Sequence, residues 1–139
     1  MQNVRAEKVT ADAVPANRRR GGDIRVVLSP RTVGATSGFM GTVTLQPGEF
    51  VAEHYHPHSE EFLYVVSGDL VLRLDGQPLP LSAGEGTMVA IGVRHRLENT
   101  GDTTAFLVFH LSPLAPRPEL GHVDTEPLPG AAEPAPTVG

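Results

Sequence analysis

The sequence predicts an all-β fold, an antiparallel sandwich or barrel, and three observations carry this prediction. Seven short segments between residues 24 and 110 are rich in the β-branched and aromatic residues that favour strands. Turn-forming residues separate most of these segments. No stretch of the chain shows a sustained helical period with capping residues. At 139 residues the chain is expected to form one domain with its own hydrophobic core.

The expected strands follow one another at short intervals. They cover residues 24–28, 38–46, 50–56, 61–66, 69–75, 86–91 and 104–110. The turn signals between them are Gln46–Pro47–Gly48, Ser67–Gly68, Asp75–Gly76 and Ala83–Gly84. Asp75–Gly76 is a strong signal for a two-residue hairpin. Strands of this length at this spacing are typical of an antiparallel sandwich or barrel.

The chain divides into three parts. Residues 1–22 form a mixed, polar N-terminal arm that ends in three consecutive arginines, Arg18–Arg20, before two glycines. Residues 23–112 hold the expected strands. Residues 113–139 form a proline-rich tail, and its last dozen residues are expected to be disordered.

The composition excludes several classes of protein. Lysine and arginine total 11 against 16 aspartates and glutamates, so the formal net charge is −5, which disfavours a nucleic-acid partner. The absence of cysteine excludes disulfides and thiolate metal sites. The longest apolar runs are five residues, too short for a membrane helix, and the polar N-terminus lacks a secretory signal. We therefore expect a cytoplasmic protein with no membrane partner.

The stretch GEFVAEHYHPHSEEFLYVVSG, residues 48–68, concentrates potential metal ligands. Side chains alternate between the faces of a strand, so His54 and His56 point the same way, about 7 Å apart along the backbone. Two such imidazoles can converge on one ion. Glu61 begins the next expected strand and can add a carboxylate. The alternative is that the two histidines form a surface pair.

A second stretch, GEGTMVAIGVRHRLEN at residues 84–99, favours the metal site. Taken together, the two stretches resemble the two motifs of the cupin superfamily. The matching positions of the first are Gly48, His54, His56, Glu61 and Gly68, and those of the second are Gly84, Gly92, His95 and Asn99. Only Ala90 departs from the pattern, because it stands where the family has proline, and this predicts a less rigid turn before His95.

This resemblance implies a jelly-roll β-sandwich, or barrel, with one divalent metal ion inside. The residues that would hold the ion are His54, His56, Glu61 and His95. Zinc is the expected ion and ferrous iron is the alternative, since both accept imidazole-rich ligand sets. Two histidines outside the motifs, His58 in a turn and His122 in the tail, are expected to take no part.

His110 is a further candidate from the last expected strand. In a jelly roll this strand lies beside the one that begins at Glu61. If Phe106 and Val108 face inward, His110 does too, and it is then a fifth candidate ligand or a proton acceptor that shares this role with Glu61. The alternative is a buried histidine hydrogen-bonded to a backbone carbonyl.

Two further stretches, residues 17–41 and 110–126, are similar to the small cupin cyclases found with aromatic polyketide synthases. The similarity spans about residues 10–127. It implies a metal-dependent polyketide cyclase, which closes and aromatises rings of a poly-β-keto intermediate by intramolecular aldol chemistry, in the biosynthesis of an antibiotic or pigment. Glu61 or His110 would take the proton. The apolar residues expected to fold the substrate are Phe39, Val43, Leu63, Val65, Met88 and Phe106.

Other functions and partners remain open at this stage. The alternative enzyme is a cupin oxygenase that uses ferrous iron on a small aromatic or polyketide-derived substrate. A non-catalytic binding module is disfavoured, because the complete ligand set is retained. The resemblance also implies a homodimer. Arg18–Arg20 either attract an acidic acyl carrier protein bearing the substrate, or are solvated or part of a dimer contact.

Overall fold

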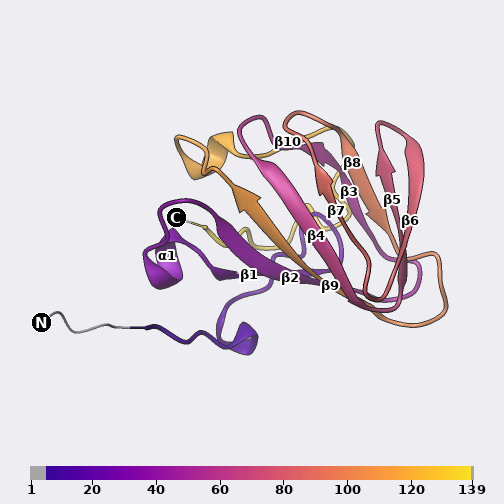
Figure 1. Cartoon of the computed structure of the whole chain (residues 1–139), viewed down its shortest axis with the longest axis horizontal. Coiled ribbons are helices and arrows are strands. Elements are labelled where there is room, and N and C mark those ends of the chain that lie inside the picture. The colour runs from indigo at the N-terminus through magenta and orange to yellow at the C-terminus, as the bar shows by residue number, and fades with distance from the viewer. Residues whose placement is uncertain (1–5, 139) are drawn as a thin grey trace, which may run out of the picture.

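Two five-stranded antiparallel sheets pack face to face in the computed structural model of the chain, which describes residues 6–138 (Figure 1). The strands are β1 (Asp23–Leu28), β2 (Phe39–Leu45), β3 (Phe50–Tyr55), β4 (Glu60–Ser67), β5 (Asp69–Leu74), β6 (Gln77–Ser82), β7 (Gly86–Val89), β8 (His95–Glu98), β9 (Ala105–Ser112) and β10 (Val123–Asp124). One sheet has the order β1-β2-β9-β4-β7, and the other has the order β10-β3-β8-β5-β6.

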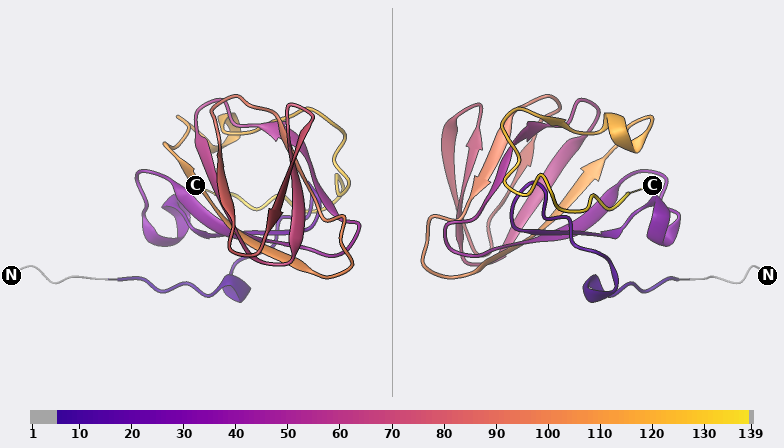
Figure 2. Two further views of the ribbon diagram at one scale, coloured as in Figure 1. Left: turned by 45° about the vertical axis from the view of Figure 1, so that its right-hand side comes forward. Right: turned by 180° about the vertical axis from the view of Figure 1, so that it is seen from behind.

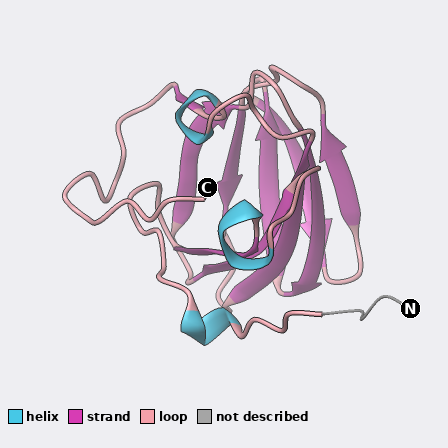
Figure 3. Ribbon diagram, turned by 90° about the vertical axis from the view of Figure 1, so that its left-hand side faces the viewer, coloured by secondary structure: helices cyan, strands magenta, loops and turns pink. Residues whose placement is uncertain are grey.

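This arrangement confirms the predicted antiparallel jelly roll. Every paired set of strands is antiparallel, from β1 with β2 to β5 with β6. The two sheets curve around a common interior (Figure 2). The three helical turns, η1 (Ala11–Ala13), α1 (Pro30–Val33) and η2 (Pro118–Leu120), lie outside the sheets (Figure 3). No helix within residues 6–138 is long and apolar enough to cross a membrane.

The hydrophobic core fills the space between the sheets because alternate side chains of each strand point inward. Its buried members are Ile24, Val43, Leu45, Val51, Leu63, Val65, Leu70, Leu72, Leu81, Val89, Leu97, Ala105, Leu107, Phe109 and Leu111. β9 shows the alternation most regularly, since buried and half-buried residues alternate over its whole length.

Local sequence explains the turns. Asp75 and Gly76 both have positive φ, 49° and 83°, as a two-residue type I′ hairpin requires. They join β5 to β6, and Leu74 faces Gln77 across the turn. The predicted hairpin is therefore confirmed. Gly68 also has positive φ, and a Cβ there would lie 2.7 Å from Ala105 Cα, so a side chain would collide with β9.

Several elements lie outside the strands expected from the sequence, among them β6, β8, β10 and the helical turns. β6 contains two prolines, which cannot donate to a ladder, and it is accommodated at the edge of its sheet. The single-turn helix α1 begins after Ser29, whose side chain accepts a hydrogen bond from the Thr32 N–H in a capping box. Gly34 ends this helix in the left-handed conformation.

The C-terminal tail folds back along the sandwich, beside the N-terminal segment (Figure 2). β10 pairs with β3, and the Arg19 side chain donates to the carbonyl oxygens of Ala131 and Glu133 at 2.7 and 3.0 Å. Arg31 Nη1 lies 2.5 Å from Thr137 Oγ1. These contacts give the tail a defined path to residue 138. The disorder expected for its last dozen residues stays a prediction.

Candidate functional site

Four of the five predicted ligands meet inside the sandwich. One ligand atom from each of four residues lies within 4.8 Å of the others, and the residues are His54, His56, Glu61 and His95. β3 carries His54 and leads into His56, β4 carries Glu61, and β8 begins at His95, which pairs with His54 across the ladder. All four are buried, with at most 8% of each residue exposed. The prediction that His54 and His56 share an inward face is confirmed.

The backbone fixes the orientation of all three imidazoles. In each ring, Nδ1 lies within hydrogen-bond distance of a carbonyl oxygen, and so it carries the proton and donates it. The three pairs are His54 with Ala52 at 2.7 Å, His56 with Gly121 at 2.9 Å, and His95 with Val93 at 3.0 Å. Nε2 of each neutral ring then has a free lone pair, which is the tautomer that a metal-binding histidine needs.

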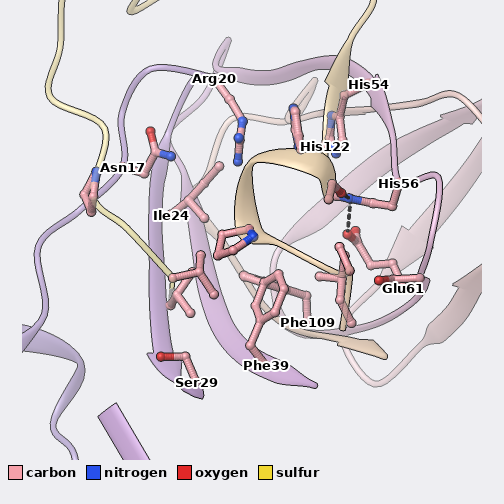
Figure 4. Close-up of a pocket in the computed structure, with 18 of the residues that line it drawn as sticks. Asn17, Arg20, Ile24, Ser29, Phe39, His54, His56, Glu61, Phe109 and His122 are labelled. Carbon is pink, nitrogen blue, oxygen red and sulfur yellow. Dashed lines mark hydrogen bonds and ion pairs between the residues drawn. The ribbon is translucent and has the colours of Figure 1, made fainter. Parts of the chain in front are cut away.

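The contact between His56 and Glu61 indicates a cation. His56 Nε2 lies 3.0 Å from Glu61 Oε2 (Figure 4). His95 Nε2 lies 3.6 Å from Glu61 Oε1. Among the described residues, neither buried Nε2 atom has a hydrogen-bond partner of good geometry. Lone pairs that face a carboxylate repel it unless a metal ion or a proton lies between them. Three imidazole nitrogens and one carboxylate oxygen fit a divalent ion such as zinc or ferrous iron.

The electrostatics of the cluster favour the metal-binding form of two of its members, His54 and Glu61. Burial, and then the neighbouring imidazoles of His95 and His122, lower the pKa of His54 well below 6.5. Burial alone would raise the pKa of Glu61, but the contacts with His56 and His95 outweigh it and hold this pKa well below 4.5. Burial opposes a charge on His95, yet the Glu61 carboxylate raises its pKa. Glu61 is therefore ionised and His54 is neutral near pH 7.

A cavity of about 890 Å³ opens beside the cluster, between the two sheets (Figure 4). Its wall is mainly apolar and includes Phe39, Val43 and Leu63, as the sequence predicts. Phe39 and Phe109 meet edge to face there, with their ring centroids 6.2 Å apart. The tail closes part of the cavity with residues 135–138.

Three apolar residues that were expected to contact the substrate do not line this cavity. Met88 is 41% exposed, because its neighbour Val89 takes the inward position of β7. Phe106 lies on the outer face of β9. Val65 is buried, but it belongs to the hydrophobic core.

The interpretation that His110 faces the metal site is wrong. β9 does lie beside β4, and His110 pairs with Phe62 there, as expected. The inward positions of β9, however, are Leu107, Phe109 and Leu111. His110 therefore points to the outer face of the sheet, opposite to Glu61, and can be neither a ligand nor a proton acceptor in this cavity.

His122 lies in the site, although the sequence placed it in the tail without a role. Its ring stacks on His54, with the centroids 4.3 Å apart and the planes at 16°. Burial and then the charge of Arg20 lower the pKa of His122 to about 2, although Asp124 Oδ1 lies 2.6 Å from Nε2. The neutral ring donates Nε2–H to Asp124, and Nδ1 is buried without a hydrogen-bond partner among residues 6–138.

No local pattern marks His122, because β10 is only two residues long and its pairing with β3 decides the position of the ring. His58, by contrast, is exposed in its turn, as expected.

Residues of the second motif, 84–99, form hydrogen bonds that stabilise the backbone around the site. Gly92 has a φ of 81°, and its N–H donates to the His56 carbonyl oxygen at 3.0 Å. The Val93 N–H donates to the Ala90 carbonyl at 3.1 Å, so a tight turn forms without the usual proline. The buried Asn99 side chain donates to the carbonyl oxygens of Leu45 and Thr103.

Comparisons with known proteins extend these observations. A family model described as "Cupin domain" matches residues 41–111. "Protein SchB" of Streptomyces halstedii is 59% identical over 126 residues, which is 91% of each chain. "Polyketide synthase CurC" of Streptomyces cyaneus is 57% identical over 91% of this chain and 82% of its own. "Tetracenomycin polyketide synthase protein TcmJ" of Streptomyces glaucescens is 52% identical over 96% of this chain and 90% of its own.

Solved structures share the fold at lower identity. The crystal structure of a predicted oxalate decarboxylase from Thermotoga maritima has a TM-score of 0.67 and 23% identity, over 78% of this chain and all of that one. An uncharacterised protein with a double-stranded β-helix domain from Klebsiella pneumoniae has a TM-score of 0.69 and 21% identity, over 88% of this chain and 99% of that one.

Proposed function

The chain belongs to the cupin family, and from this premise we propose that it is a metal-dependent cyclase of aromatic polyketide biosynthesis. One observation carries the proposal: a cluster of three histidines and one glutamate lies in the wall of a mainly apolar cavity of about 890 Å³. This volume is within the range of about 300–1,000 Å³ for small-molecule sites. The names of the relatives CurC and TcmJ, both described as polyketide synthase proteins, support the substrate class.

The proposed reaction is an intramolecular aldol addition followed by loss of water. A methylene between two carbonyl groups loses a proton, and its carbon forms a bond to a distant carbonyl carbon of the same chain. Water then leaves and the ring becomes aromatic by enolisation. These reaction steps involve no net oxidation or reduction of the substrate, so the reaction needs no redox-active cofactor.

The residues of this chain divide the work between them. His54, His56 and His95 hold the ion, which when bound supplies a Lewis acid for carbonyl oxygens. Glu61 is ionised before the reaction and completes the cluster. We propose that its carboxylate accepts the proton that leaves the methylene. A carboxylate of low pKa is a weak base, but a carbon between two carbonyls is unusually acidic.

The apolar wall orients the substrate. Phe39, Phe109 and Leu63 present apolar surface to a flexible chain and exclude water from the site. Holding the two reacting carbons in one conformation can account for several kcal/mol of the barrier. Closure by the correct pair of carbons then depends on the shape of the cavity.

An oxygenase is the second candidate, because the same donor set suits ferrous iron as well as zinc. The two functions differ in their use of oxygen. An oxygenase consumes oxygen and depends on iron, whereas the aldol reaction proceeds without oxygen and with zinc.

The test uses the ethyl ester of 3,5,7-trioxooctanoic acid, which cyclises by a single aldol step. Protein loaded with zinc, protein loaded with iron and chelator-treated protein are compared with buffer, both anaerobically and in air. The expected result is faster formation of one aromatic isomer by the zinc-loaded protein, unchanged without oxygen. Rates and isomer ratios equal to those in buffer would exclude the cyclase, and oxygen uptake with iron alone would favour the oxygenase.

Two partners remain proposals. A homodimer is expected from the family, and apolar side chains on the outer face of one sheet, among them Phe62 and Tyr64, are exposed. A carrier protein bearing the substrate is expected to be acidic if Arg18 helps to attract it.

A further inference from the structure

The three consecutive arginines of the N-terminal arm have three different surroundings. Arg18 forms an ion pair with Asp23 at 3.2 Å, and Arg19 donates to two carbonyl oxygens of the tail. Arg20 instead lines the cavity (Figure 4). Its guanidinium forms no hydrogen bond or ion pair with any residue in the described range 6–138. The three arginines therefore do not form one charged surface, because the side chain of Arg20 lies in the wall of the cavity.

The backbone holds Arg20 firmly in this position. Its carbonyl oxygen accepts a hydrogen bond from the Ala52 N–H at 2.8 Å. The next residue, Gly21, has a φ of 106°, and a Cβ there would lie 1.8 Å from the Phe50 carbonyl oxygen. The chain is therefore pressed against β3, the strand that carries His54. The Arg20 side chain is fixed at its base and directed into the cavity that holds the metal cluster.

The surroundings of the guanidinium favour an anion. Burial lowers the pKa of Arg20, and the negative charges that oppose this effect, Asp124 and Glu61, make no direct contact with it. The group remains charged, since arginine is not deprotonated in proteins. Arg20 is half-buried, and a charge partly removed from water without a partner is costly, so a negative ligand would reduce this cost.

We propose that Arg20 binds the substrate through two coplanar oxygen atoms that share one negative charge. The inference rests on the proposed function and identifies how the site holds one end of its substrate. Two groups of a poly-β-keto chain have this chemistry, a terminal carboxylate and the enolate of a 1,3-dicarbonyl unit. Either one presents its oxygens in the geometry that the planar guanidinium fork matches. Arg20 is thus a substrate-binding residue that sets the position of the chain relative to the metal cluster.

The test measures binding in the chelator-treated full-length protein, so that a metal ion does not compete for the same oxygens. The probes are naphthalene-2-carboxylate, its neutral amide naphthalene-2-carboxamide, and benzoylacetone above and below the pH at which its enol ionises. Inorganic phosphate is the fourth probe. The variants are Arg20→Gln and Arg20→Lys, and Arg18→Gln is the matched control from the same run of arginines.

Arg20→Gln is expected to weaken binding of naphthalene-2-carboxylate, of the benzoylacetone enolate, or of both by about tenfold or more. The anion affected identifies the group that Arg20 holds. The neutral probes should bind equally to the wild type and all variants, and Arg18→Gln should leave every Kd unchanged. Arg20→Lys should recover part of the loss, because it keeps the charge without the fork.

Stability provides a second readout. An arginine kept for folding would lower the Tm when replaced, whereas an unpaired cavity arginine predicts that Arg20→Gln has an unchanged or higher Tm. Equal weakening of anionic and neutral probes, tighter binding of phosphate than of carboxylate, or a lower Tm with unchanged anion binding would each overturn the inference.

The failures of the two proposals are distinguishable. Anion binding that depends on Arg20, in a protein that never accelerates cyclisation, would contradict only the proposed function. If the protein accelerates cyclisation but its affinity for anions is the same with and without Arg20, only this inference is contradicted.

Discussion

The imidazole of His110 lies against the ring of Phe62 on the outer face of the sheet, with the ring centroids 6.2 Å apart. Phe62 follows Glu61 in β4, so the two side chains point to opposite sides of the same strand. Neighbouring residues of one strand therefore belong to the candidate metal site and to the outer surface of the sheet.

Replacing His110 with alanine should change neither metal content nor cyclisation rate, because the side chain does not reach the cavity. Replacing His95 with alanine should remove most of the metal, since one of four clustered ligands is lost. Elemental analysis of both purified variants, as a metal-to-chain ratio, checks this pair. Metal loss in His110→Ala would contradict the placement of β9.

Replacing Glu61 with glutamine should weaken both metal retention and turnover. The amide keeps the shape but removes the negative charge that faces His56 and His95, and the loss of a proton acceptor lowers rates by about 100-fold or more. Metal retention is measured by dialysis against a chelator, with His58→Gln as the control because His58 is exposed in a turn. Full metal retention with lost turnover would leave Glu61 as a proton acceptor and not a ligand.

Replacing Asn99 with alanine should lower the free energy of unfolding by about 2–3 kcal/mol, because the buried carbonyl of Leu45 and the partly buried carbonyl of Thr103 lose their donor. Thr100→Ala is the matched control, since its neighbouring side chain is exposed. Urea unfolding of chelator-treated samples measures both changes. A loss as small as that of Thr100→Ala would show that water replaces the amide.

Acid should destabilise the metal-free protein in part through His54. The unfolded chain takes up a proton at this residue below about pH 6.5, whereas the buried ring has a much lower pKa in the folded state. The unfolded state then binds more protons, so stability falls as pH decreases from 7 to 5, by up to about 1.4 kcal/mol per pH unit for one such group.

The Glu61 contact raises the pKa of His95 and so acts in the opposite direction. Urea unfolding of wild type and His54→Gln at each pH therefore isolates the contribution of His54. The variant should show the shallower fall, and parallel curves would mean that His54 protonates normally in the folded protein.

Removing the two arginine anchors of the tail should release its end. Arg19 and Arg31 contact Ala131, Glu133 and Thr137, so the double variant Arg19→Ala/Arg31→Ala should exchange the amide hydrogens of residues 131–138 faster than wild type. Hydrogen exchange followed by mass spectrometry measures this, with Arg117→Ala as an exposed control. Unprotected amides in the wild type itself would support the disorder that the composition predicts.

The fold and most of the candidate metal site could be predicted from the sequence. Turn residues such as Asp75–Gly76 delimit the strands, and the period of two places His54 and His56 on one face. The resemblance to the two cupin motifs adds Glu61 and His95. These features are local, or repeat over a few residues, so they do not depend on how distant segments pack.

The orientation of β9 and the paths of both ends of the chain were decided only by tertiary structure. Both faces of β9 are apolar, with Leu107 and Phe109 on one side and Phe106 and Val108 on the other. Its hydrophobic pattern therefore could not select the face that carries His110, because a shift of one residue leaves either face apolar.

Arg20 and His122 come from the two end segments, and the described parts of these segments, residues 6–22 and 113–138, have no long strand or helix to fix their side chains. Their positions depend on contacts with β3, through the Ala52 N–H and through the pairing of β10. The sequence by itself therefore determined the antiparallel β fold through its local periodicity, and its resemblance to the cupin motifs implied the jelly roll and the four clustered ligands. The charged and aromatic groups that complete the cavity depend on long-range packing, which no local pattern records.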